Sequence, residues 1–365
     1  MDSFADILRP PTYWVGNRCY RVLNPAAVSQ STTNYAEGDA YSFEDAVYQD
    51  EVECTQEMPE VQIDQLDNGK FQTSFPVANT YFSYIIGSKG ATKKRIENDT
   101  FTQIRIPAKG QTGDIVIIGR DIKTVRQARI KIEMLVEQAR KKMPPTHFLS
   151  MPTNHPDVQE RFLKFKEEVL EKCGDCRGVG EDIFPKPEKL HLTLCVMVLA
   201  DERERHQAVD VLKLCPESVL RKQLAGQPLK VELKGLEYMN DDPEEVDVLY
   251  GQVTALNWSH SLQSIADSLV DEFIKAGIAK QQRERVKLHV TLMNTSFRNR
   301  QEGVEEERTG RERESFSAQR ILEEFGDYYF GIMEIEEVHL SLRHTNANSG
   351  YYSASAKIRV FLSPI

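Results

Sequence analysis

The hexapeptide Lys-Leu-His-Leu-Thr-Leu at residues 189–194 recurs as Lys-Leu-His-Val-Thr-Leu at residues 287–292, with one substitution in six positions. In a β-strand, successive side chains point to opposite faces, so the histidine and threonine of each copy share one face and the aliphatic residues share the other. A helix and a strand are predicted before each copy, which indicates two lobes related by pseudo-symmetry. We expect these lobes to bring four polar side chains into one cleft: His191, Thr193, His289 and Thr291.

This set of side chains suits metal-free phosphodiester chemistry. The ordinary histidine pKa of about 6.5 allows one imidazole to act as general base and the other as general acid near neutral pH. The threonine hydroxyls can donate hydrogen bonds to the non-bridging phosphoryl oxygens, on which charge grows in the transition state. We therefore predict that His191, Thr193, His289 and Thr291 are catalytic residues, with no metal and no cofactor.

The repeat resembles the two-histidine phosphoesterase family, whose signature is a pair of His-x-[Ser/Thr]-x motifs on facing lobes. The resemblance covers residues 146–365 and implies a hydrolase that acts on phosphodiesters or cyclic phosphate ends. Two other interpretations stay open: a cleft that binds RNA or a nucleotide without turnover, in an adaptor or scaffold, and two core strands with buried histidines. The pseudo-symmetry also leaves open which histidine is the acid.

A second pattern, Gly-Ser-Lys-Gly, lies upstream between a predicted helix at 81–86 and another at 91–99. Predicted strands at 103–107 and 115–118 and a helix at 122–141 follow. The glycines let a sugar-phosphate backbone approach closely because they have no Cβ, and the second helix directs unpaired N–H groups at the same place. We expect Gly87, Ser88, Lys89, Gly90, Lys93 and Lys94 to bind nucleic acid, and Ile85, Ile86 and Ile104 to line an apolar groove beside the loop.

This order of helix, Gly-x-x-Gly loop, helix, two strands and helix resembles a type I KH domain over about 70 residues. In KH domains the loop clamps the backbone of about four single-stranded nucleotides. The resemblance implies RNA or single-stranded DNA as a partner, and the residues do not decide between them. A glycine turn in a small protein-binding domain is the alternative.

The net charge of −10 is unevenly distributed. Residues 22–69 carry eleven acidic and no basic residues, whereas residues 70–142 carry fifteen basic and six acidic residues. A basic block inside an acidic chain indicates a localised polyanion site, although a solvated charged surface would have the same composition. Residues 24–68 have a linker-like composition, and their isolated aromatic residues leave docking to a partner open.

We expect a mixed α/β (α+β) chain in three parts. Residues 1–69 form an N-terminal segment and acidic linker that is partly disordered, residues 70–143 a type I KH domain, and residues 146–365 the two-lobed phosphoesterase-like domain. The longest apolar stretch is far shorter than the roughly 20 residues of a membrane helix, so we expect no membrane partner. Six scattered cysteines and the lack of a signal sequence indicate a reducing compartment.

Several weaker features fit a structural role better than a chemical one. A third motif, at His339, follows His289 too soon to form another lobe, so we expect a strand that lines or flanks the cleft. Cys173 and Cys176 have no second pair at zinc-ribbon spacing. Tyr238 and Tyr250 could stack on a base but more often pack in a core. The remaining features are an acidic turn at 240–245 and a charged loop at 298–314 that could act as a lid.

The pairing of the two modules carries a further resemblance. Through this pairing, Asp-Ile-Leu-Arg-Pro at residues 6–10 and the tract at 237–243, the chain resembles a family of subunits of a nuclear complex. The resemblance implies a nuclear protein that works with a helicase and other subunits of that complex. It also implies roles in transcription coactivation and in the repair of alkylated nucleic acid.

Overall fold

The computed structural model describes residues 12–15, 18–21 and 61–361, apart from 109, 112, 240, 257–261, 281–283 and 299–313. The chain divides into two units, Met1–Glu60 and Val61–Ile365. In the first unit, β1 (Thr12–Val15) and β2 (Arg18–Arg21) pair antiparallel. No helix in the described part of the chain is long and apolar enough to cross a membrane.

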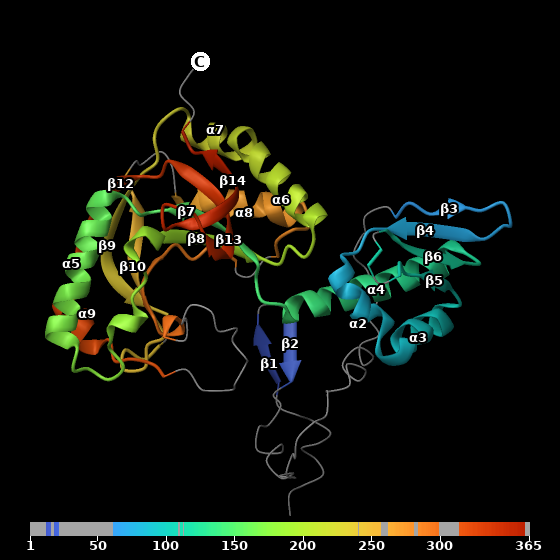
Figure 1. Cartoon of the computed structure of the whole chain (residues 1–365), viewed down its shortest axis with the longest axis horizontal. Coiled ribbons are helices and arrows are strands. Elements are labelled where there is room, and N and C mark those ends of the chain that lie inside the picture. Colours follow the sequence, from blue (N-terminus) through green and yellow to red (C-terminus); the bar gives the residue numbers. More distant parts are fainter. Residues whose placement is uncertain are drawn as a thin grey trace, which may run out of the picture. The chain divides into compact units, whose positions relative to one another are not determined.

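The second unit begins with a small α/β domain (Figure 1). Its sheet is antiparallel, with the strand order β3-β4-β6-β5, and its helices lie between and after the strands along the chain. The order of helices and strands that follows β4 is the one expected for a type I KH domain. The elements are β3 (Asp64–Gln65), β4 (Phe71–Phe75), α2 (Phe82–Ile86), α3 (Ala91–Thr100), β5 (Gln103–Arg105), β6 (Ile115–Gly119) and α4 (Ile122–Lys142).

The long helix α4 supplies one wall of this domain's core. It begins after Asp121, whose carboxylate accepts a hydrogen bond from the Thr124 N–H (2.9 Å), and such a cap satisfies one of the free N–H groups of the first turn. One face of α4 is apolar and buried, as the helical spacing of its residues predicts. The fully or almost fully buried residues on this face are Val125, Ala128, Ile132, Leu135 and Ala139.

The larger domain is built on an eight-stranded antiparallel sheet with the order β12-β9-β10-β11-β8-β7-β13-β14. The boundary between β11 and β8 has four strands on each side, so the two lobes form one continuous sheet. The prediction of a two-lobed domain after a KH domain is confirmed. The strands are β7 (His147–Pro152), β8 (His191–Met197), β9 (Lys230–Tyr238), β10 (Val248–Ala255), β11 (Val290–Asn294), β12 (Tyr329–Glu334), β13 (Glu337–Asn346) and β14 (Tyr352–Arg359).

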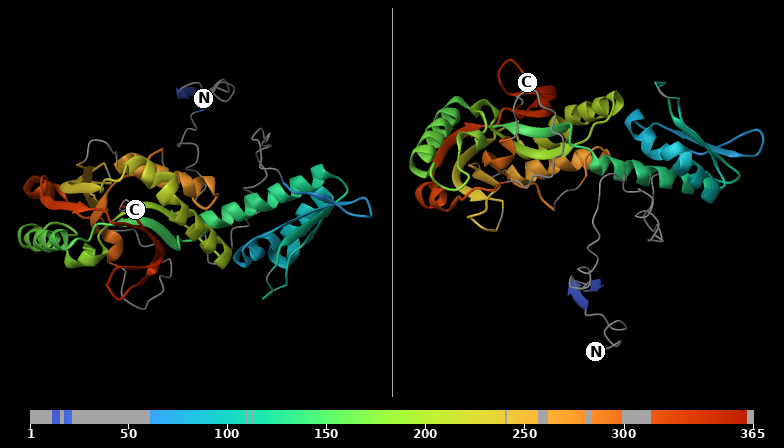
Figure 2. Two further views of the ribbon diagram at one scale, coloured as in Figure 1. Left: turned by 90° about the horizontal axis from the view of Figure 1, so that it is seen from above. Right: turned by 60° about the horizontal axis from the view of Figure 1, so that its bottom comes forward.

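Helices cover one face of this sheet and share its hydrophobic core (Figures 1 and 2). Helices α5 and α9 pack over the β9 and β12 end, whereas α6 and α8 pack over β8, β13 and β14. Asp201 caps α6 by accepting a hydrogen bond from the Glu204 N–H (2.8 Å). The helices are α5 (Pro156–Cys173), α6 (Glu202–Cys215), α7 (Arg221–Leu224), α8 (Leu262–Lys275) and α9 (Gln319–Phe325), with a π-helical turn at Pro216–Leu220.

Parts of the larger sheet were not predicted from the sequence. Strand β7 was missed because five of its six residues are buried, which removes the alternation typical of a half-exposed strand. Strand β11 begins at Val290, after the Lys-Leu-His of the second motif copy. The segment before it is held by side chains instead, because the Val286 N–H donates to Asp267 (2.8 Å) and the Lys287 carbonyl accepts from His289.

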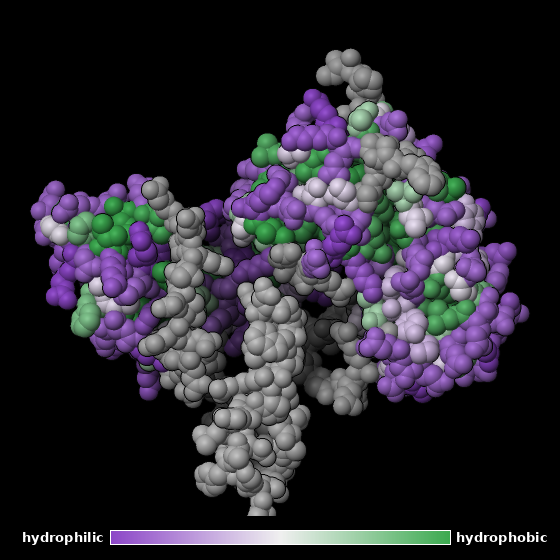
Figure 3. Space-filling view, turned by 180° about the vertical axis from the view of Figure 1, so that it is seen from behind, coloured by the Kyte–Doolittle hydropathy of each residue, from purple (hydrophilic) through white to green (hydrophobic). Residues whose placement is uncertain are grey.

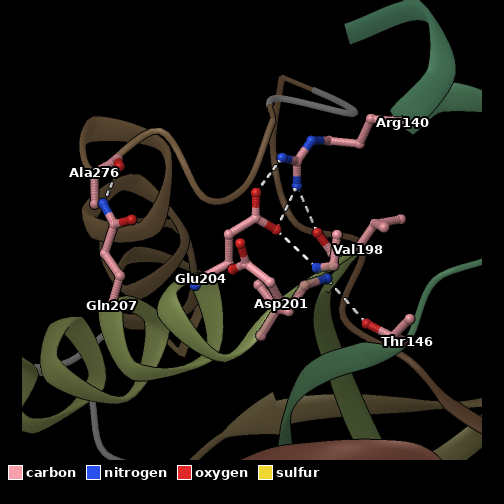
Figure 4. Close-up of polar contacts among 9 residues, drawn as sticks. Arg140, Thr146, Val198, Asp201, Glu204, Gln207 and Ala276 are labelled. Carbon is pink, nitrogen blue, oxygen red and sulfur yellow. Dashed lines mark hydrogen bonds and ion pairs between the residues drawn. The ribbon is translucent and has the colours of Figure 1, made fainter. Parts of the chain in front are cut away.

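A buried ion pair joins the last turn of α4 to the start of α6 (Figure 4). The Arg140 guanidinium donates to both carboxylate oxygens of Glu204 and to the Val198 carbonyl (2.6 Å). Glu204 also accepts from the Ala200 N–H (2.7 Å), and the ring of Tyr81 lies 5.2 Å from the guanidinium. Burial is the main cause that raises the pKa of Tyr81 to about 12.

The outer surface of the described chain is mostly hydrophilic. Figure 3 shows charged and polar side chains over most of the visible face, with scattered hydrophobic patches. The large apolar side chains that are exposed come from different elements, for example Phe101 after α3, Leu163 on α5 and Leu214 on α6. Single exposed apolar side chains of this kind are normal for a folded protein and indicate no particular site.

Candidate functional site

The two His-x-Thr copies meet where the lobes join. Strands β8 and β11 pair antiparallel, with Leu192 directly opposite Val290. The residues on either side of this pair point to the opposite face of the sheet, so the histidine of each copy lies across from the threonine of the other. The two opposed pairs are His191 with Thr291 and Thr193 with His289. The register therefore gathers two imidazoles and two hydroxyls on one face.

These four side chains remain partly open to solvent, whereas the aliphatic residues between them are buried. Leu190, Leu192 and Val290 are at most 1% exposed and belong to the hydrophobic core. The histidines and threonines are half-buried, as the alternation of the repeat predicts. A cavity of about 210 Å³ lies against Thr193 and His289. Of the four side chains, this cavity is lined by Thr193 and His289 and not by His191 or Thr291. The partial exposure of all four leaves them accessible to a reacting group, which fully buried core histidines would not be.

Backbone carbonyls hold both imidazoles in the same way. His191 Nδ1 lies 2.6 Å from the Lys189 carbonyl oxygen, and His289 Nδ1 lies 2.7 Å from the Lys287 carbonyl oxygen. A carbonyl oxygen can only accept a hydrogen bond, so the proton of each neutral ring is on Nδ1. Each Nε2 consequently carries the lone pair that a general base needs, or the exchangeable proton once the ring is charged.

Aromatic rings surround His191. Its ring centroid lies 5.2 Å from Phe148, 5.4 Å from Tyr352 and 6.3 Å from Tyr351. Burial, aided by the charge of His289 and opposed by the bond to the Lys189 carbonyl, lowers the pKa of His191 to about 4. His191 is therefore neutral near pH 7, in the state of a resting general base.

The surroundings of His289 repeat part of this arrangement. Tyr250, on β10, meets the His289 ring at 5.5 Å in an edge-to-face contact, and the Lys287 ammonium lies 4.8 Å from the centre of the tyrosine ring. The Tyr250 hydroxyl donates to Glu237 (2.6 Å), which fixes the ring. In the first copy, the Lys189 ammonium lies 5.1 Å from the centre of the Tyr352 ring.

The sequence analysis missed most of these aromatic neighbours, because they come from strands far from the motifs along the chain. The lysine two residues before each histidine was a visible signal, since it is identical in both copies. Each lysine stacks on the tyrosine that packs against its own histidine. Tyr250 was singled out as a residue for base stacking, and the structure places it beside His289. Tyr238 instead packs against the core.

The Gly-x-x-Gly loop has the backbone that its sequence requires. Gly87 and Gly90 have φ values of +70° and +81°, and Lys89 between them lies at +50°. Ser88 and Lys89 are exposed at the tip of the loop, and α3 begins directly after it at Ala91. The tip thus presents a cation and the positive end of the α3 dipole, both of which favour a phosphate backbone, while the Gly90 and Ala91 N–H groups donate to the Gly87 and Ser88 carbonyls.

The predicted apolar groove needs correction. Ile85 is fully buried and Ile104 is 1% exposed, so both belong to the core and are not available to a ligand. The side chain of Ile104 points inward because the residues on either side of it in β5 are exposed. Ile86 is half-buried.

The two lysines predicted on α3 differ in their surroundings. Lys94 is exposed, whereas Lys93 is half-buried and forms an ion pair with Glu97 (3.5 Å). Lys94 can therefore meet a phosphate without first breaking an ion pair of this kind, and Lys93 cannot.

The weaker candidates lie apart from the His-x-Thr pairs. His339 is on β13, which is separated from β8 by β7. Cys173 is buried, and burial raises the pKa of its thiol. In the acidic turn, Asp242 accepts from the Glu244 N–H (2.8 Å). The described residues contain no group of three or more His, Cys, Asp or Glu side chains placed to hold a metal ion. Most of the charged loop at 298–314 lies outside the described residues.

Fold and site together define an RNA-binding protein of the KH class with a two-histidine phosphoesterase-like domain. Residues 72–134 match the KH domain family, and residues 145–360 match the family described as the AKAP7 2′5′ RNA ligase-like domain. The chain belongs to this ligase-like family. It is 37% identical over 361 residues to "Activating signal cointegrator 1 complex subunit 1" of Mus musculus, covering 97% of this chain and 99% of that protein.

Solved structures with similar folds match one domain each. The first KH type I domain of human Vigilin covers 25% of this chain and 96% of its own length, with 18% identity and a TM-score of 0.21. The protein TT0787 of Thermus thermophilus covers 59% of this chain and 97% of its own length, with 16% identity and a TM-score of 0.35. A structure described as a phosphoesterase covers 60% of this chain and all of its own, with 14% identity and a TM-score of 0.35.

Proposed function

We propose that the protein is an RNA-binding phosphodiesterase that cleaves or trims a phosphodiester or a cyclic phosphate end. The observation that carries the proposal is the register of β8 and β11, which sets each histidine across from the threonine of the other copy. Two imidazoles that flank one phosphate supply a general base and a general acid. The threonine hydroxyls supply hydrogen bonds to the phosphoryl oxygens.

In this proposal the two histidines take different roles. His191 is neutral near pH 7, so its Nε2 can accept a proton from the attacking hydroxyl or water. His289 would then donate a proton to the leaving oxygen from its own Nε2. The carbonyl oxygens of Lys189 and Lys287 hold each ring by Nδ1, and they keep each Nε2 available while its proton comes and goes.

The catalytic proposal is tested by turnover of a panel of short RNA ends. We expect the wild type to release product, and His191→Ala and His289→Ala each to lower kcat by about 100-fold or more, the usual contribution of a general acid or base. His206→Ala, which changes an exposed histidine on α6, is the matched control and should keep full activity. Rates that do not differ between the wild type and the two site variants would remove the catalytic claim.

The KH loop is tested separately by binding of single-stranded RNA. Ser88→Asp/Lys89→Asp places two negative charges at the exposed loop tip and should weaken binding at least about tenfold, with a shallower dependence on salt concentration. Asn98→Asp, at an exposed position near the far end of α3, is the control for added charge. Unchanged affinity of the folded double variant would contradict nucleic-acid binding at this loop.

A binding adaptor without turnover is the second candidate, because the same side chains could hold a phosphate end. Thr193→Val and Thr291→Val separate the two functions, since they remove hydrogen bonds to the phosphate and leave the histidines in place. Tight binding of RNA ends by the wild type without any product, lost in these variants, would establish the adaptor. Product formation by the wild type would exclude it.

We also propose that this chain works in a nuclear complex with a helicase and other subunits, in transcription coactivation and in repair of alkylated nucleic acid. The support is its similarity to a mouse protein named as subunit 1 of the activating signal cointegrator 1 complex. The test is purification of the tagged full chain from nuclear extract. Recovery of a helicase subunit that depends on residues 1–68, while RNA binding does not, would support a docking role for that segment.

A further inference from the structure

The two motif lysines, Lys189 and Lys287, lie in surroundings that are unusual for a lysine. Both side chains are half-buried, whereas the long charged side chain of lysine is mostly exposed in folded proteins. Each ammonium lies over a tyrosine ring, at 5.1 Å from the centre of Tyr352 and at 4.8 Å from the centre of Tyr250. A cation over the face of an aromatic ring is attracted by its negative charge density. Each lysine therefore stabilises the position of one tyrosine.

Each tyrosine in turn packs against the histidine of the same motif copy. The ring centroid of Tyr352 lies 5.4 Å from that of His191, with an angle of 81° between the ring planes. The ring centroid of Tyr250 lies 5.5 Å from that of His289, with an angle of 71°. Both contacts have the edge-to-face geometry that aromatic pairs prefer. In each copy, one tyrosine ring therefore contacts both the lysine and the histidine of the motif.

The main chain of the same lysines also holds the imidazoles. His191 Nδ1 lies 2.6 Å from the Lys189 carbonyl oxygen, and His289 Nδ1 lies 2.7 Å from the Lys287 carbonyl oxygen. A single hydrogen bond fixes the position of one ring atom but leaves the plane of the ring free to turn, because hydrogen-bond angles are broadly distributed. The tyrosine contact restricts that remaining freedom. Each lysine thus acts on its histidine twice, directly through its carbonyl and indirectly through its side chain.

The two tyrosines do not come from equivalent places in the fold. Tyr250 on β10 lies directly opposite Thr291, so it shares the sheet face of the second motif copy. The equivalent position beside the first copy, opposite Thr193 on β7, is occupied by Ser150, which has no ring. The first copy obtains Tyr352 from the start of β14 instead, and β14 is separated from β8 by β7 and β13. Duplication of a lobe does not explain this repeated contact, which indicates a shared role at the two histidines.

We propose that the two motif lysines are positioning residues, each of which orients the histidine of its own copy through the tyrosine that both of them contact. The inference rests on the proposed function for its effect on rate, because proton transfer requires each Nε2 to be aimed at the reacting phosphate. The lysines do not touch the substrate in this arrangement, since their ammonium groups lie over the tyrosine rings. Direct binding of the substrate phosphate by the lysines is the alternative that the experiments separate.

The first experiment measures kcat and KM of the full chain with the RNA end that the wild type turns over fastest. Lys189→Met keeps the apolar stem and removes the charge, and we expect kcat to fall by about tenfold with KM unchanged, the order of one cation–π contact. Lys189→Arg should restore most of kcat, because a guanidinium also binds the face of a ring. In a Tyr352→Leu background, Lys189→Met should have no further effect, since the lysine acts through that ring. The matched control is Lys186→Met, at an exposed lysine three residues earlier, which should keep the wild-type kcat.

The second experiment needs no turnover. Nitrogen-15 NMR of the histidine rings, at a pH above about 8 where an ordinary imidazole is neutral, reports which ring nitrogen carries the proton. We expect the proton on Nδ1 of both rings in the wild type, and a mixture of the two tautomers at His191 alone in Lys189→Met. Lys287→Met should produce the mixture at His289 alone, so each lysine variant is the control for the other copy. Lys186→Met should match the wild type at both rings.

Two results would overturn the inference. The first is a rise in KM without a fall in kcat, or an effect of Lys189→Met that is as large without Tyr352 as with it, because the lysine would then bind the substrate directly. The second is an unchanged kcat and unchanged tautomers in both lysine variants while the wild type turns over RNA ends, in which case the proposed function stands alone. If the wild type turns over no RNA end but each lysine variant changes the tautomer of its own histidine, the catalytic proposal fails and the positioning role stands.

Discussion

The two histidines of the candidate site have similar sequences around them but different surroundings. The rings of Phe148, Tyr351 and Tyr352 lie near His191, and the ring of Tyr250 lies against His289. The sequence repeat predicts equal roles for the two residues, because five of six positions are the same. Phe148 on β7 and Tyr352 at the start of β14 belong to the surroundings of the first copy. Tertiary packing, rather than the motif, thus makes the surroundings of the two histidines differ.

The low pKa of His191 makes the stability of the protein depend on pH. Burial holds this pKa at about 4 in the folded state, below the value of about 6.5 in the unfolded chain. Between these two values the unfolded state binds more protons, so this contribution to stability is fully present above pH 6.5 and is lost as the pH falls toward 4. We expect the free energy of unfolding of the wild type to drop by about 2 kcal/mol more than that of His191→Asn over this range.

Urea unfolding of both proteins at pH 7 and pH 4.5 measures this difference. The quantity compared is the change in the free energy of unfolding between the two pH values. The carboxylates and the other histidines titrate in both proteins alike, so their contribution cancels in this comparison. Equal pH dependence in the wild type and in His191→Asn would contradict the burial of a neutral imidazole at this position. For the same reason, the loss of kcat of the wild type on acidification should have its midpoint closer to pH 4 than to pH 6.5.

At the scale of elements, the two glycines of the KH loop are required to different degrees and for different structural reasons. A Cβ on Gly87 would lie 2.1 Å from Thr92 Oγ1 and 2.9 Å from the Thr92 backbone nitrogen, whereas a Cβ on Gly90 would meet no atom within 4 Å. Gly87 also has φ +70° and ψ 179°, a region that is almost limited to glycine. Gly90 lies in the left-handed helical region, where other residues are tolerated at a modest cost.

We therefore expect Gly90→Ala to destabilise the KH domain by about 1 kcal/mol and Gly87→Ala by about 3 kcal/mol. Urea unfolding followed by circular dichroism measures both values. Equal effects of the two substitutions would show that the contact with Thr92 does not constrain the loop. For the same reason, changes at Ser88 and Lys89 are better probes of RNA binding than changes at Gly87, because they leave the turn intact.

Most of the elements could be predicted from the sequence, and the exceptions have physical causes. Helices α3 and α4, predicted at 91–99 and 122–141, begin at the expected residue and end one residue later. Strands β4, β7 and β12 were missed, since β7 is buried almost throughout and the other two lack an apolar alternation. The prediction that Ile85 and Ile104 line the groove was wrong, because an apolar residue beside a binding loop is more often part of the core.

The candidate site was only partly predictable. The four side chains on the common face follow from the repeat and from the alternation of a strand. Their opposed register, and the tyrosines that each motif lysine stacks on, depend on which strands become neighbours in the sheet. No local pattern carries that information.

At the scale of the whole molecule, the ion pair of Arg140 with Glu204 makes the KH helix α4 and the larger domain structurally dependent on each other. The two side chains are only 23% and 13% exposed, and Glu204 also caps the Ala200 N–H. Removing one partner of a buried pair leaves the other charge without compensation, which is usually costly. Because the pair spans two domains, its loss should reduce their cooperativity as well as their stability.

We expect Arg140→Met, which keeps an apolar stem beside Tyr81, to lower the free energy of unfolding by about 2 kcal/mol and to separate the thermal unfolding of the KH domain from that of the larger domain. Lys141→Met changes the next residue of α4, which is exposed, and is the matched control. Scanning calorimetry should record one transition for the wild type and the control and two for Arg140→Met. A single transition at the wild-type temperature would mean that the ion pair does not couple the domains, and each would then bind its own part of an RNA independently.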